Sequence, residues 1–121
     1  MPGDMYAKKT QYSAFTASSS TLDRELRERG IDTLLICGTA TNVCCESTAR
    51  DATMLDYRVA MLSDATATWT DQEHQAALTS FVLFFGDVMT TGEALTRLVA
   101  RGDRRPSPGG SPVRLACRDA S

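Results

Sequence analysis

The residue best placed to do chemistry in this sequence is Cys44, which follows an apolar, strand-like run at 33–37 and stands where a helix is expected to begin. Amide groups in the first turn of a helix lack intrahelical partners, and together with the helix dipole they favour a thiolate over a neutral thiol. A thiolate is a nucleophile, so the position predicts covalent attack on an electrophilic carbon. Taken alone, a cysteine at such a junction is more often a small buried hydrophobic side chain.

The neighbouring reactive side chains are less distinctive. Cys45 lies about 100° around the helix from Cys44, so at most one of the two faces a given site, and Cys45 is expected to pack in the core. Lys8 and Lys9 point to opposite faces of an extended segment, and the residues alone do not choose between them. His74 is the only histidine, and an exposed or lightly bonded role is expected for it rather than catalysis.

Composition fits one small domain without polyanionic partners. The 121 residues, 42% hydrophobic and 23% charged, suffice for one domain, and a net charge of -2 gives no reason to expect nucleic acid or an anionic membrane as a partner. No leader-like or bilayer-length apolar run is seen, so the protein is expected in the cytoplasm with reduced thiols. No metal-ligand cluster or phosphate-binding glycine motif is found, so neither a metal nor a cofactor is predicted.

Strand and helix patterns alternate along the chain, and right-handed crossovers then favour a parallel sheet covered by helices. Strands are expected at 5–8, 33–37, 58–62 and 88–89, and helices at 21–29, 42–55, 70–85 and 91–102. A capping box at Thr70 and Glu73 opens the third helix, Thr91 is expected to cap the fourth, and the segment 64–69 is expected to be a polar loop. The sequence thus predicts one domain over 1–102 and a disordered Pro/Gly/Arg tail over 103–121.

Several motifs in one order identify a family. The matching segments are Lys9–Phe15, Gly30–Ile31, Gly38–Ala52, Asp64–Thr66 and Phe85–Val88. In order and spacing they resemble the isochorismatase-like cysteine hydrolases, over about residues 4–98. Within that family, the runs 40–44 and 46–48 look most like those of the ureidoacrylate amidohydrolases.

The resemblance implies a fold and a set of catalytic groups. The fold is a three-layer α/β/α, Rossmann-like parallel sheet. Cys44 matches the family's nucleophile and Lys9 its active-site lysine. The resemblance also implies a non-proline cis peptide between Thr39 and Ala40, with the N–H groups of Ala40 and Cys44 facing the substrate oxyanion.

The same resemblance implies a small-molecule substrate, an amide, carbamoyl or ureido compound whose C–N bond is cleaved through a thioester. Phe15, Thr41 and Asn42 are the candidate substrate-pocket residues. No metal and no cofactor are implied at these positions, and the common oligomeric state of the family makes a homo-oligomer the expected assembly.

The sequence also departs from the family pattern. The N-terminal strand, helix and strand, with the aspartate that acts as general acid and base, have no counterpart before Met5, so impaired activity is expected. The resemblance places the missing first strand between the strand that precedes Lys9 and the strand that precedes Cys44, so the sheet is expected to be incomplete, with two exposed strand edges. Two alternatives stay open: an inactive fragment or pseudoenzyme acting as an oligomerising module, and a thiol redox protein using Cys44 and Cys45.

Overall fold

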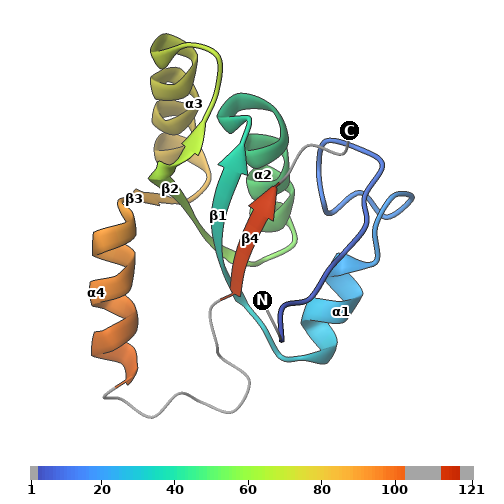
Figure 1. The fold of residues 1–121 in the computed structure, drawn as a ribbon. Helices are drawn as coiled ribbons and strands as arrows, with labels where there is room; N and C mark the ends of the chain where they lie inside the picture. The colour runs from blue at the N-terminus through green and yellow to red at the C-terminus, as the bar shows by residue number, and fades with distance from the viewer. Residues whose placement is uncertain (1–2, 103–112, 118–121) are drawn as a thin grey trace.

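The computed structural model describes residues 3–102 and 113–117. These residues form a four-stranded sheet in the order β3-β2-β1-β4, in which every pair of neighbours is parallel (Figure 1). The strands are β1 (Thr33–Thr39), β2 (Arg58–Ala67), β3 (Asp87–Met89) and β4 (Val113–Cys117). The predicted α/β class with a parallel sheet is confirmed.

One helix precedes β1, and the others lie in the crossover connections between successive strands. They are α1 (Leu22–Glu28), a π-helical turn η1 (Thr41–Cys45) that runs directly into α2 (Glu46–Met54), α3 (Asp71–Phe84) and α4 (Thr91–Gly102). None of the helices in the described part of the chain is long and apolar enough to cross a lipid bilayer.

The alternation of side chains along β1 creates two cores. Leu34 and Ile36 are fully buried in the larger core, which also takes side chains from α1, α2 and α3, including Phe81 at 0% exposure. Leu35 and Cys37 point to the opposite face, where a smaller core contains Ala94 of α4 together with residues of β2 and β3. The sheet therefore separates two helical layers, and the predicted three-layer arrangement is confirmed.

Strand β2 is longer than the sequence predicted. Ile36 of β1 pairs with Met61, but the next pairs, beginning with Gly38 and Thr66, lie several residues further along β2. The extra residues bulge out of the ladder, and the Thr66 hydroxyl closes the bulge by donating to the Leu62 carbonyl at 2.8 Å. The expectation of a polar loop over 64–69 is therefore wrong for residues 64–67, because Gly38 and Thr39 extend β1 and offer them a partner.

The edge of β1 opposite β2 is not open. Strand β4 pairs with it in parallel, from Leu34 with Val113 to Gly38 with Cys117. The expected disordered tail is thus wrong for residues 113–117, because an unpaired strand edge can capture any extended segment within reach. Residues 103–112 and 118–121 of that tail lie outside the described residues. Residues 5–8, expected as a strand, are irregular in the structure.

The helix starts follow local capping chemistry. The Thr70 side chain accepts from the Glu73 N–H at 3.2 Å, which confirms the predicted capping box of α3. At α4 the capping side chain is Thr90 rather than the predicted Thr91, since Thr90 accepts from the Glu93 N–H at 3.1 Å. Thr91 instead donates both its N–H and its hydroxyl to the Asp64 carboxylate, each at 2.8 Å, and so ties α4 to β2.

Candidate active site

The chain turns sharply between β1 and the helix that carries Cys44. The peptide bond between Thr39 and Ala40 is cis, as the sequence predicts. The Ala40 carbonyl then accepts from the N–H groups of Val43 and Cys45, both at 3.1 Å, and the second bond spans five residues as in a π-turn. Cys44 therefore lies in a π-helical turn at the carboxyl end of β1, where ligands bind in parallel α/β sheets.

The two adjacent cysteines are both buried. Cys44 is 3% exposed and Cys45 is 0% exposed, and both belong to the larger core. The burial of Cys45 agrees with the prediction that it packs rather than reacts.

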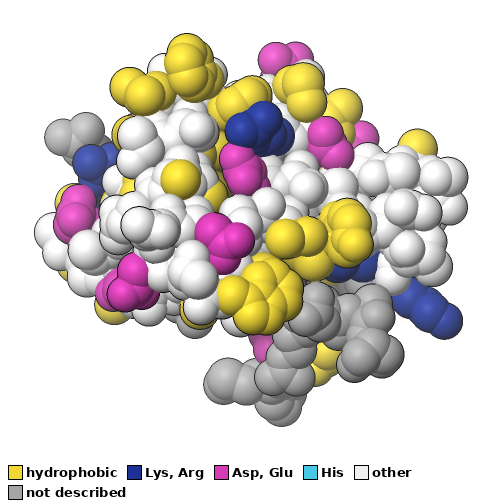
Figure 2. All heavy atoms as spheres, turned by 90° about the horizontal axis from the view of Figure 1, so that it is seen from above, with side chains coloured by type: hydrophobic (Ala, Val, Ile, Leu, Met, Phe, Trp, Pro, Cys, Tyr) yellow, Lys and Arg dark blue, Asp and Glu magenta, His cyan; other side chains and the backbone are white. Residues whose placement is uncertain are grey.

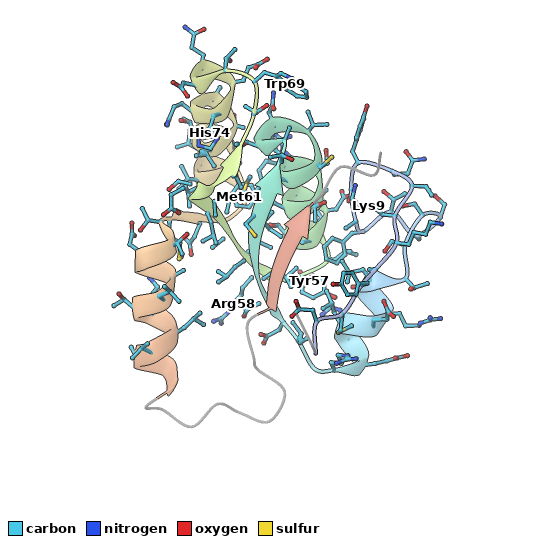
Figure 3. All side chains as sticks on the ribbon, viewed as in Figure 1. Lys9, Tyr57, Arg58, Met61, Trp69 and His74 are labelled. Carbon is cyan, nitrogen blue, oxygen red and sulfur yellow. The ribbon has the colours of Figure 1, made fainter. Side chains whose placement is uncertain are left out.

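A hollow of about 220 Å³ opens beside the cis peptide. It is lined by Thr39 and Ala40 and by the residues that end and follow β2, namely Ala67, Thr68 and Trp69. The Trp69 side chain is 79% exposed, and it lies in the upper part of the molecule near the carboxyl ends of the strands (Figure 3). Seen from above, Figure 2 shows hydrophobic side chains exposed in separate groups among acidic, basic and uncharged ones. The hollow thus borders the predicted oxyanion segment.

Lys9 lies on the N-terminal segment, on the side of β4 away from α3 (Figure 3). It is half-buried, and its ammonium group donates to the Gln11 carbonyl at 3.0 Å. The same segment is fixed to α2, because the Ala14 N–H donates to the buried Thr48 hydroxyl at 3.0 Å. Thr48 follows Cys44 by four residues, so the segment bearing Lys9 is attached to the helix face that bears the cysteine.

The three predicted pocket residues have other contacts in the structure. Thr41 is 0% exposed, and its hydroxyl is bonded to the ring of His74. Asn42 is half-buried, and its side-chain oxygen accepts from the Thr68 hydroxyl at 2.7 Å. Phe15 is 8% exposed and packs against the Tyr57 ring, with centroids 5.3 Å apart.

Sequence reasoning missed the roles of His74 and Thr68. Neither ring nitrogen of His74 is left to solvent, because Nδ1 is bonded to Thr41 and Nε2 to the Ser63 carbonyl. The expectation of an exposed or lightly bonded histidine is therefore wrong. The position of His74 in the first turn of α3, directly after the end of the strand that borders the hollow, is the sequence signal that could have indicated this role.

Two side chains near the sheet have shifted ionisation. Burial, and then a hydrogen bond to the Asp23 carboxylate at 2.6 Å, raise the pKa of Tyr57 above its ordinary value. Hydrogen bonds from Thr91 hold the pKa of the Asp64 carboxyl below its ordinary value. Both shifts belong to structural contacts and not to the surroundings of Cys44. Within the described residues no group of histidine, cysteine and carboxylate side chains could hold a metal ion.

Comparisons to known proteins identify the family and the fold. A family model, the isochorismatase domain, matches residues 1–93. The chain belongs to the isochorismatase family. It is 43% identical over 96 residues to the uncharacterized isochorismatase family protein YwoC of Bacillus subtilis, covering 79% of this chain and 50% of that protein. It is 48% identical over 93 residues to the ureidoacrylate amidohydrolase RutB of Caulobacter vibrioides, covering 76% of this chain and 40% of that protein.

Solved structures show the same fold. An isochorismatase-like hydrolase from Alkaliphilus metalliredigens superposes with a TM-score of 0.76 at 36% identity, covering 81% of this chain and 53% of that one. The nicotinamidase SaPncA from Staphylococcus aureus superposes with a TM-score of 0.67 at 30% identity, covering 73% and 56% of the two chains. The chain spans about half the length of these relatives, or less.

Proposed function

We propose that this chain carries the nucleophile of a cysteine hydrolase that cleaves the C–N bond of a small amide, carbamoyl or ureido compound. The observation that carries the proposal is the placement of Cys44 in a π-turn directly after the cis peptide between Thr39 and Ala40. The hollow beside that peptide gives a substrate carbonyl a place to lie. The similarity to ureidoacrylate amidohydrolases favours the ureido class.

In this mechanism the Cys44 thiolate attacks the carbonyl carbon, and the N–H groups of Ala40 and Cys44 are the proposed donors to the oxyanion. The C–N bond then breaks as the Cys44–carbon bond is kept, and the amine leaves with the proton that the Cys44 thiol gave up on ionising. Water attacks the resulting thioester, releases the acid and restores the thiol. Lys9, on the segment that Thr48 fixes to α2, is proposed to favour the thiolate by its charge. This scheme uses no metal ion. Self-association of the chain stays a prediction.

The test is ammonia release from a panel of ureido, carbamoyl and amide compounds, with nicotinamide included. We expect Cys44→Ala to abolish release, because no other group in the scheme attacks the carbonyl. We expect Cys45→Ala, which removes a sulfur of equal size one position away, to keep most of the activity. Intact-mass measurement of the acid-quenched reaction should show an acyl or carbamoyl adduct on the peptide that contains Cys44.

Two results would refute this assignment. One is activity that survives Cys44→Ala, and the other is an equal loss in both variants at equal folded fractions. If the wild-type chain hydrolyses none of the compounds while Cys44 reacts no faster with iodoacetamide than free cysteine does, the inactive interaction module becomes the better description.

A further inference from the structure

The bonding of His74 fixes its tautomer. Its Nε2 lies 3.1 Å from the Ser63 carbonyl oxygen, which can only accept a hydrogen bond, so Nε2 carries the proton. In the neutral ring Nδ1 is then an acceptor, and the Thr41 hydroxyl, 2.8 Å away, is the donor. The half-buried ring thus joins β2, through Ser63, to the first residue of η1.

Thr41 connects the His74 ring to the turn that carries Cys44. It follows the cis peptide directly and stands three residues before Cys44. It is 0% exposed, so in the intact protein its hydroxyl is shielded from solvent and bonded to the His74 ring. A second hydrogen bond, from Thr68 to Asn42 at 2.7 Å, holds the next residue of the same turn. The π-turn that presents Cys44 is therefore held from α3 and from the end of β2.

We propose that His74 is a positioning residue for the cysteine chemistry. Its ring, bonded to Ser63 through Nε2, holds the Thr41 hydroxyl through Nδ1 and so fixes the π-turn that carries Cys44. His74 does not touch the substrate and moves no proton. The proposal deepens the hydrolase function proposed above and rests on it.

A double-mutant cycle between His74 and Thr41 tests the proposal. His74→Ala removes the acceptor, and Thr41→Val removes the donor at nearly constant volume. Because both act by releasing the same turn, we expect each to lower kcat about 10- to 100-fold with KM changed less than about threefold, the scale of a misplacement near 1 Å. The double variant should lose no more than the worse single variant. Thr41→Ser, which keeps the donor, should recover most of the loss.

The matched control is Thr70→Ala. It removes the N-cap of α3 one turn before His74 and leaves the bond between His74 and Thr41 intact. It is expected to lower the melting temperature without lowering kcat per folded molecule. If Thr70→Ala lowers kcat as much as His74→Ala, His74 acts only through the stability of α3 and the proposal fails.

A second readout separates this proposal from the hydrolase function. The rate of Cys44 alkylation by iodoacetamide needs no substrate, and it should fall at least about threefold in His74→Ala and in Thr41→Val, without adding in the double variant. The proposal is overturned if the losses of alkylation rate add in the double variant, or if both single variants are alkylated at the wild-type rate. A wild type that turns over no substrate, and whose Cys44 reacts no faster than free cysteine, refutes the hydrolase function, while the alkylation cycle still decides whether His74 holds the turn. If His74→Ala does not fold, Thr41→Val alone decides the result, against Thr41→Ser.

Discussion

A buried hydrogen bond joins the N-terminal segment to α2. The Ala14 N–H, on a residue 6% exposed, donates to the hydroxyl of Thr48, which is 0% exposed, at 3.0 Å. Thr48→Val keeps the shape of the side chain but leaves this N–H without its acceptor. An unsatisfied buried donor costs about 1–3 kcal/mol. At about 4 °C per kcal/mol for a chain of this size, the melting temperature should fall by about 4–12 °C.

Hydrogen exchange locates the effect, because the Ala14 amide should exchange roughly 5- to 150-fold faster in Thr48→Val, the equivalent of that free energy. Thr48→Ser is the matched control. It loses a buried methyl group worth about 1 kcal/mol but keeps the acceptor, so its stability falls while Ala14 stays protected. Two outcomes would show that this bond does not hold the segment that bears Lys9. One is an Ala14 amide that stays as protected from exchange in Thr48→Val as in wild type. The other is an Ala14 amide that loses as much protection in Thr48→Ser as in Thr48→Val when the two variants are equally stable.

Gly86→Ala should lower the free energy of unfolding in urea by about 1–3 kcal/mol, because the new Cβ would lie 2.5 Å from the Val59 carbonyl oxygen. Gly92→Ala in α4, where the nearest atom is 3.8 Å away, should not destabilise the protein, and equal losses would contradict this account. Asp64→Asn should be less stable than wild type near pH 7, because the lowered pKa of Asp64 means that its carboxylate stabilises the fold above the ordinary aspartate pKa of about 4. This stability is lost as the pH falls through the folded pKa, so the urea midpoints of the two proteins should converge in acid. A difference between the midpoints that does not change with pH would refute the role of the Asp64 charge at Thr91.

Local signals predicted the elements whose causes are local. The run at 33–37 became β1, and the capping pair Thr70 and Glu73 set the start of α3, because both depend on neighbours within a few residues. The cis peptide after Thr39 was predicted only through the family resemblance, since no rule of spacing indicates a cis bond without proline.

The features that escaped prediction depend on partners far along the chain. The extension of β2 needs Gly38 and Thr39 as partners, and β4 forms only because β1 offers an edge. The same holds for the candidate site. His74 looked like an isolated polar residue because Thr41, 33 positions away in sequence, gives its ring a function that no local pattern reveals.

The pairing of β1 with β4 sets an order of events during synthesis. Residues 113–117 follow every other element, so the ladder between Leu34 and Val113 encloses α2, β2, α3, β3 and α4 in one loop. Contacts of such sequence separation form late, because the entropy of closing the loop must be overcome before any ladder hydrogen bond is gained. Until the ribosome has released residue 117, β4 cannot pair with β1. That interval is when the protein is most prone to join strands with another copy, and chaperone capture during translation matters most then.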